Sequence, residues 1–136
     1  LVLIAAWGVG QAVIINLAGL QDISPSYYEA AEVDGATAFQ KIRHITVPLL
    51  TPVIFYNLVM GTINALQTFT LPYAMTNGDG SPVNSLLFYV MYLYSNAFGY
   101  MKMGYASAMA WILFVIILVL TLLIFRSSRH WVNYQD

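Results

Sequence analysis

Three long apolar stretches alternate with two more polar ones along the chain, and each apolar stretch is long enough for a helix that crosses a membrane. They cover about residues 1–20, 47–71 and 104–125. A bilayer core about 30 Å thick needs about 20 mostly apolar helical residues. Only Gln11 and Asn16 interrupt the first stretch, and Arg126 and Arg129 close the third. The pattern therefore predicts three transmembrane helices.

The stretch of about residues 77–102 lies between the second and third predicted spans and is itself nearly uncharged. Its continuous apolar core, residues 86–94, has nine residues and is flanked by Ser85, Ser95 and Asn96. This is too short for a crossing. Tyrosines at 89, 92, 94 and 100 suit a helix at the membrane surface, where an amphipathic ring has one hydrated end. A re-entrant or fourth spanning helix remains the alternative.

The stretch of about residues 26–46 collects charge. It holds Glu29, Glu32, Asp34, Lys41 and Arg43. Ser26 followed by Glu29 is a capping-box pattern, which predicts a helix that begins near Ser26. Gly35 predicts a break into two short helices. Pro48 and Pro52 are expected in the first turns of the next span, where a missing amide donor is tolerated.

Composition supports a membrane protein. Of 136 residues, 60% are hydrophobic and 8% charged, and the mean hydropathy is +0.70, whereas about a quarter of an ordinary soluble domain is charged. The expected fold is all-α, a polytopic membrane helical bundle. A net charge of -1 leaves no basic surface for nucleic acid. The apolar start, without Met or a charged leader, indicates a C-terminal fragment of a larger protein.

Basic residues set the expected orientation. Lys41 and Arg43 lie in one loop, and Arg126 and Arg129 follow the last span. Both pairs should face the cytoplasm, and the two spans between them allow this. The 26–46 loop and the C-terminus are therefore placed inside, and the 77–102 segment outside.

Small residues also concentrate in the 26–46 loop: Ala30, Ala31, Gly35, Ala36 and Ala38. A helix surface of Ala and Gly lets another backbone approach closely, so the loop is a candidate contact for a partner protein. A solvated hairpin whose alanines merely favour helix is equally compatible with this composition.

Motifs in this loop resemble a known family. Glu29-Ala30-Ala31, then Asp34-Gly35-Ala36, then Ile45-Thr46-Val47-Pro48, about 100 residues before the end of the chain, are similar to the EAA loop of bacterial ABC importer permeases. The segments LAGLQ from Leu17, TNG from Thr76 and GYASA from Gly104 resemble its sugar-importing branch.

The resemblance implies a role for the loop. It would be the coupling helix that docks in a cleft of a cytoplasmic ATP-binding subunit, through Glu29, Ala30, Ala31, Asp34 and Gly35. Val47 stands where Leu is usual, and Ile42 replaces an aromatic residue. The further partners implied are a second permease subunit, an extracytoplasmic solute-binding protein, membrane lipid and a sugar-like substrate, in a bacterial cytoplasmic membrane.

Polar residues inside the predicted spans form the candidate pathway. Asn57, Gly61, Asn64 and Thr68 recur at steps of four, three and four, which places them on one helix face. Gln67 lies beside this polar stripe, and Gly8 with Gln11 makes a shorter patch. Uncharged amides and hydroxyls both donate and accept, as a polyhydroxylated sugar requires. Amides that bridge neighbouring helices are the alternative.

Other functional classes are disfavoured. An enzyme within the membrane is disfavoured because His44 and His130 are the only histidines, Cys is absent and the acids cluster in one loop. We expect no metal or cofactor bound by this chain, and ATP to be used by the partner subunit, because no GxxxxGK loop occurs. An ion-coupled secondary transporter remains the alternative, although the predicted spans hold no charged residue.

Overall fold

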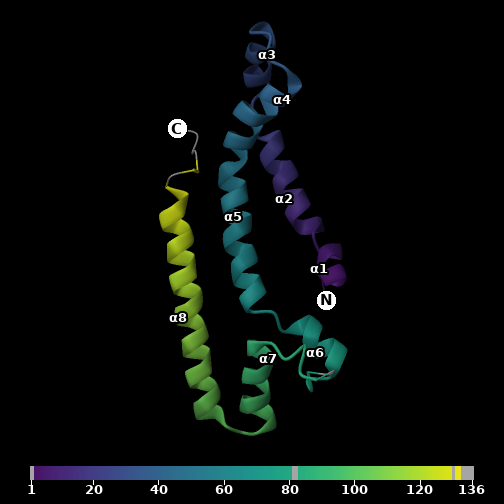
Figure 1. The fold of residues 1–136 in the computed structure, drawn as a ribbon, viewed down its shortest axis with the longest axis vertical. Coiled ribbons are helices and arrows are strands. Elements are labelled where there is room, and N and C mark those ends of the chain that lie inside the picture. Colours follow the sequence, from purple (N-terminus) through teal and green to yellow (C-terminus); the bar gives the residue numbers. More distant parts are fainter. Residues whose placement is uncertain (1, 81–82, 130, 133–136) are drawn as a thin grey trace. The chain divides into compact units, whose positions relative to one another are not determined.

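The computed structural model describes residues 2–80, 83–129 and 131–132, and all regular structure within them is helical. In chain order the elements are α1 (Val2–Trp7), α2 (Gly10–Gln21), α3 (Pro25–Val33), α4 (Ala38–Lys41), the π-helix η1 (Ile42–Thr46), α5 (Val47–Leu66), α6 (Thr70–Thr76), α7 (Tyr89–Tyr94), the π-helix η2 (Ser95–Gly99) and α8 (Met103–Ser128) (Figure 1). The all-α prediction is confirmed for this part of the chain.

The chain divides into two compact units. Of the described residues, one unit holds those of 59–125, and the other holds 2–58 together with 126–129 and 131–132. Helices α5 and α8 each run from one unit into the other.

A glycine allows close packing in the unit of residues 2–58. A Cβ atom at Gly19 of α2 would lie 2.6 Å from Cγ2 of Val53 and 3.3 Å from Cδ2 of Leu50, both on α5. Only a residue without a side chain lets the two helices approach so closely. In the same unit Phe55 meets Trp131 edge-on, with ring centroids 6.2 Å apart.

Aromatic side chains and one buried methionine hold the unit of residues 59–125 together. Tyr89 donates its hydroxyl to the backbone carbonyl of Met109 at 2.9 Å, which joins α7 to α8. Met91 on α7 is completely buried. Phe69, Tyr73, Tyr94 and Phe98 form a chain of ring contacts with centroids 4.9 to 5.4 Å apart. These contacts hold α7 against α6 and α8.

Two helical segments are long and apolar enough to cross a membrane, Ala38–Thr76 and Met103–Ser128. Only 11% and 6% of their most apolar windows is buried inside the structure, whereas the core helix of a soluble protein would be mostly covered. Most of their apolar surface is therefore left uncovered within the described part of the chain. α8 confirms the helix expected over residues 104–125, and α5 ends at Leu66, before the expected residue 71.

The first expected span does not form one helix. Residues 1–20 were predicted as a single crossing, yet α1 and α2 have 6 and 12 residues and are separated at Gly8 and Val9. The pair α7 and η2 is also short, with 6 and 5 residues, and no membrane-length helix is found there. Two of the three stretches expected to span the membrane are thus long helices in the described part of the chain.

The helix of the charged loop begins earlier than predicted. Its N-cap is Ser24, not Ser26, and the Ser24 hydroxyl oxygen accepts a hydrogen bond from the backbone N–H of Ser26 at 3.4 Å. Pro25 explains the shift, because a residue before proline is driven into extended conformation and cannot join the helix. The capping box lies further along, between Thr37 and Gln40.

The two prolines lie inside a longer helix than predicted. α4, η1 and α5 follow one another without a break, so Pro48 and Pro52 are not at the start of a separate helix. Pro52 has no N–H for the carbonyl of Pro48, four residues earlier. The Thr51 hydroxyl donates to that carbonyl at 2.7 Å. A neighbouring side chain therefore replaces the missing backbone donor.

Candidate functional site

The turn between α3 and α4 is a Schellman motif centred on Gly35. The Ala36 N–H donates to the Ala31 carbonyl at 2.9 Å, and the Gly35 N–H donates to the Glu32 carbonyl at 3.0 Å. Gly35 has a φ of 75°, in the left-handed region that glycine adopts without penalty. The predicted break at Gly35 is confirmed. The left-handed backbone conformation is the reason for a glycine here. Steric crowding is not, because a Cβ atom at this position would meet nothing within 4 Å.

Two side-chain contacts hold α3 against the helix that follows it. The hydroxyls of Tyr28 and Thr46 are hydrogen-bonded at 2.9 Å, and Lys41 donates to the Glu32 carboxylate at 2.6 Å. Tyr28 and Glu32 are four residues apart and share one face of α3. The Lys41 ammonium, first through its hydrogen bond and then through its charge, lowers the pKa of the Glu32 carboxyl. The loop is thus a fixed helical hairpin.

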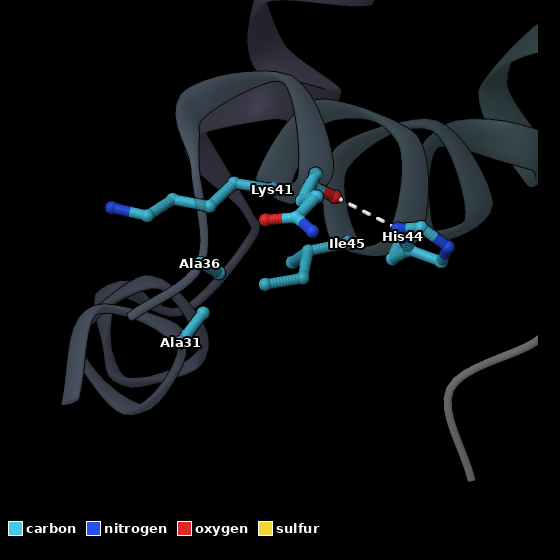
Figure 2. A pocket seen from close by; sticks show the side chains of 6 residues that line it. Ala31, Ala36, Lys41, His44 and Ile45 are labelled. Atoms are coloured by element: carbon cyan, nitrogen blue, oxygen red, sulfur yellow. Dashed lines mark hydrogen bonds between the residues drawn. The ribbon is translucent and has the colours of Figure 1, made fainter. Parts of the chain in front are cut away.

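A cleft of about 210 Å³ lies inside this hairpin (Figure 2). Its lining residues are Ala31, Ala36, Gln40, Lys41, His44 and Ile45. Figure 2 shows Ala31 and Ala36 on the α3 side, opposite Ile45 and His44. His44 Nδ1 lies 3.1 Å from the Gln40 carbonyl oxygen, and because a carbonyl only accepts, this nitrogen carries the proton. The cleft is small and mostly apolar.

The outer face of the hairpin exposes apolar side chains that the sequence analysis did not select. Val33 is 88% exposed and Phe39 is 71% exposed. Large apolar residues in a loop otherwise rich in charge were the available signal. Both side chains are accessible to a partner protein.

The five predicted docking residues occupy different environments. Glu29, Ala30, Asp34 and Gly35 are exposed, whereas Ala31 is half-buried and lines the cleft. Asp34 is the C-cap of α3. Four of the five are therefore accessible to a partner, and Ala31 instead contributes to the internal packing of the hairpin.

The polar stripe is shorter than predicted. Asn57, Gly61 and Asn64 lie on α5, with Asn57 half-buried and the other two exposed. Gln67 and Thr68 lie beyond the last helical residue, Leu66, because the helix ends before the third step of the pattern, from Asn64 to Thr68. The Thr68 hydroxyl donates to the Asn64 carbonyl at 3.1 Å, so it completes the last turn of α5.

The two residues of the shorter patch, Gly8 and Gln11, do not lie on one continuous helix, because the helix is interrupted between them. Gly8 lies in the turn between α1 and α2, and Gln11 is exposed in the first turn of α2. Asn16, further along α2, donates its amide to the carbonyl of Ala12 at 2.8 Å. Gln11 is therefore the exposed polar side chain of this patch.

An open apolar cleft of about 420 Å³ lies along α8. Ser107, Ala110, Trp111 and Phe114 line it, and Trp111 meets Phe114 edge-on with centroids 5.7 Å apart. These residues recur at helical spacing on one face of α8. Its apolar lining suits an acyl chain or another helix better than a sugar. In the described part of the chain, no three His, Asp or Glu side chains gather as a metal site requires.

Comparisons with known proteins identify what the chain is similar to. Residues 1–132 match the family model described as "Binding-protein-dependent transport system inner membrane component". The chain is 50% identical, over its full length, to the "Probable ABC transporter permease protein YesP" of Bacillus subtilis, of which it covers 44%. It is 43% identical over 116 residues to the sulfoquinovosyl glycerol transport system permease protein SmoG of Agrobacterium fabrum, with 85% of this chain and 37% of that protein covered.

The name of a third relative also describes a transport system permease protein. The arabinooligosaccharides transport system permease protein AraP of Bacillus subtilis is 38% identical over 129 residues, which cover 94% of this chain and 41% of that protein. The chain thus spans less than half the length of these relatives. No solved structure matches it significantly.

Proposed function

The chain belongs to the family of inner membrane components of binding-protein-dependent transport systems, and on this premise we propose that it is part of the permease subunit of a bacterial ABC importer. The match of the family model to residues 1–132 carries the proposal. The proposed role is to form part of a translocation pathway and to transmit the action of an ATPase on another chain. The family is one of transport permeases, and we assign ATP hydrolysis to that partner.

A sugar or sugar-like solute is the proposed substrate. The names of two relatives refer to a sulfoquinovosyl glycerol and to arabinooligosaccharides. Asn57, Asn64, Gln67 and Gln11 supply uncharged amides, which both donate to and accept from hydroxyl groups. Gly61 leaves room beside the amides of α5, because a Cβ atom there would meet nothing within 4 Å, and Gly8 lies in the turn before Gln11. The Thr68 hydroxyl donates to the Asn64 carbonyl at the end of α5.

The hairpin of α3, α4 and η1 is the proposed contact with the ATPase subunit. Glu29, Ala30, Asp34 and Gly35 are exposed on it, together with the apolar Val33 and Phe39. We assign the docking contact to these six residues and give Ala31 a packing role. The contacts from Tyr28 to Thr46 and from Glu32 to Lys41 join α3 to the helix that continues into α5, which gives a displacement of the hairpin a route to α5.

The proposed topology has three spans. α5 and α8 are two of them, and α1 with α2 forms the third across its break at Gly8. Basic residues in the hairpin and at the end of α8 support a position of both on the cytoplasmic side of the plasma membrane, and α7 would then lie at the outer surface. A solute-binding protein would deliver substrate to that outer side, and a second permease subunit would complete the pathway.

Uptake in proteoliposomes tests the proposal. The full transporter, reconstituted with its ATPase subunit and solute-binding protein, is expected to accumulate radiolabelled sugar only when ATP and binding protein are both present. An ATPase variant unable to hydrolyse ATP is the control. Accumulation driven by an ion gradient without ATP would instead identify an ion-coupled secondary transporter and overturn the proposal.

The polar stripe has its own test in Asn64→Leu. This change removes an exposed amide from α5 and should raise the substrate concentration for half-maximal uptake, by about tenfold for one lost hydrogen bond of about 1.5 kcal/mol. Ala65→Leu, at the next and also exposed position, is the matched control for added bulk. Equal uptake by both variants and the unaltered protein would leave Asn64 with a packing role only.

A further inference from the structure

The turn that leads into α8 exposes several large apolar side chains within six residues. Phe98 is 57% exposed, Tyr100 66%, Met101 76% and Met103 51%. Lys102 lies among them, with its ammonium 5.8 Å from the centre of the Tyr100 ring. We refer to residues 98–103 as the 98–103 turn. It combines apolar and aromatic surface with one cation.

The backbone holds this turn in a fixed conformation. The Tyr100 N–H donates to the Ser95 carbonyl at 2.9 Å, and the Lys102 N–H donates to the Asn96 carbonyl at 2.8 Å. Between them Met101 has a φ of 55°, in the left-handed region that non-glycine residues rarely adopt. The Met101 side chain is therefore directed outward by a turn that is anchored on both sides.

The length of α8 determines the depth of the turn in a membrane. α8 has 26 residues, and Arg126 lies in its last turn. An arginine at the end of a span extends to the headgroup layer, and a hydrocarbon core of about 30 Å takes about 20 helical residues. Counted back from Arg126, the opposite edge of the core falls near Ala106. The 98–103 turn then lies in the headgroup layer of the other leaflet.

We propose that the 98–103 turn is an anchor for the lipid headgroup layer. Phe98, Met101 and Met103 insert at the boundary of headgroups and acyl chains, the Tyr100 ring lies at the same level, and Lys102 meets lipid phosphate. The chemistry fits, because aromatic residues and lysine with an apolar stem prefer this zone. The inference rests on the proposed assignment of α8 as a membrane span.

Site-directed spin labelling tests the anchor. Because the sequence contains no Cys, Met101→Cys places a unique thiol in this chain, within a full-length protein cleared of any other cysteine. The labelled protein is reconstituted in vesicles of phosphatidylethanolamine and phosphatidylglycerol. Collisions with oxygen and with a nickel chelate report the depth of the label. Leu118→Cys, in the middle of α8, is the reference for the bilayer interior, and Asp22→Cys is the reference for water.

The expected depth of the Met101 label is between the two references, within about 10 Å of the boundary between headgroups and acyl chains. Met101→Asn keeps a residue that tolerates the left-handed conformation but removes the apolar chain. In that background, a label at Phe98→Cys should move toward water relative to the same label in the Met101 protein. This second measurement remains informative if Met101→Cys alone disturbs the turn.

A Met101 label as accessible to nickel as the Asp22 label would overturn the anchor. So would a label that oxygen and nickel both fail to reach, because another protein segment would then cover the turn. Immobilisation that appears only after a solute-binding protein is added would assign the turn to that partner instead. The depth measurement does not depend on transport, so loss of sugar uptake would contradict the proposed function and leave the anchor intact.

Discussion

Gly35 and Thr51 each stabilise the backbone at a place where regular helical hydrogen bonding is interrupted. Gly35 adopts the left-handed conformation that ends α3, and Thr51 supplies the hydrogen bond that Pro52 removes from α5. Sequence alone indicated the first position, because glycine in a run of helix formers marks a break. It did not indicate the second. In an apolar span, the sequence does not show whether a threonine hydroxyl bonds to the backbone or lines the translocation pathway.

Gly35→Ala tests the Schellman turn. A Cβ atom in the left-handed region costs about 1–2 kcal/mol, so the turn should open about tenfold more often. The amide of Ala36, which bonds to the Ala31 carbonyl, should exchange its hydrogen about tenfold faster in a mass-spectrometric or NMR measurement. The Ala36 amide hydrogen should exchange more slowly in Gly35→Asn than in Gly35→Ala, because Asn tolerates the left-handed conformation. Identical exchange in the two variants would contradict the conformational explanation.

Thr51→Val tests the replacement of the missing proline donor. The side chain keeps its shape but loses the hydroxyl that meets the part-buried Pro48 carbonyl, and leaving such a carbonyl without a donor costs about 1 kcal/mol. We expect a lower midpoint of thermal unfolding in detergent. Thr51→Ser, which retains the hydroxyl, should stay closer to the unaltered protein. A Thr51→Val protein as stable as Thr51→Ser would show that the carbonyl is satisfied in another way.

At the scale of elements, the contacts between α3 and the following helix explain why a loop of small and charged residues is ordered. The sequence predicted two short helices and the break between them. It placed the capping box at Ser26 and Glu29 because the spacing fits, whereas the restriction that Pro25 imposes on Ser24 decides the start of α3. The break at Gly8 was not predicted, since the composition of an apolar stretch does not reveal where its helix is interrupted.

The ion pair of Glu32 and Lys41 makes this contact dependent on pH. Lys41 lowers the pKa of Glu32 in the folded hairpin, whereas an unfolded Glu has a pKa of about 4.3. Its stabilising effect is therefore complete above that value and is lost as the pH falls through the lower, folded pKa. A carbon-13 NMR titration of the Glu32 carboxyl should show a midpoint below the unfolded value.

Lys41→Met is the variant that checks this assignment. It keeps a long apolar stem and removes the ammonium, so the Glu32 midpoint should return toward the ordinary value for glutamate. High salt should act in the same direction, since the pair is largely exposed on the Glu32 side. A midpoint that stays low in Lys41→Met would attribute the shift to another group.

At the scale of the whole molecule, the order of apolar segments was the most predictable property. α8 was predicted almost to its ends, because 22 uncharged residues followed by arginines leave few alternatives. The polar stripe was predicted with less success. Its periodicity was continued from Asn57 to Thr68, but periodicity does not show that α5 ends at Leu66, before the last member.

Topology in the membrane gives a prediction at this scale. Single cysteines at Thr37, in the hairpin, and Ser127, at the end of α8, should react with a membrane-impermeant maleimide from the same side. A cysteine at Asn84, which is exposed between α6 and α7, should react from the opposite side. Labelling of right-side-out and inverted vesicles measures this. Reaction of all three from one side would contradict the arrangement of spans around α5 and α8.

The π-helix η1 has a consequence for the whole helix in which it lies. A π-turn accommodates one more residue than an α-turn, and each residue of an α-helix advances the side chains by about 100°. Deleting one residue from Ile42–Thr46 and restoring regular α-geometry would therefore leave the direction of everything after it almost unchanged, whereas changing Ile42–Thr46 to regular α-geometry without deleting a residue would rotate everything after it by about 100° relative to the hairpin. Asn57, Gly61 and Asn64 would keep their spacing on α5 but point in a new direction relative to α3. A helix of unchanged length and composition would then present its amides to a different neighbour.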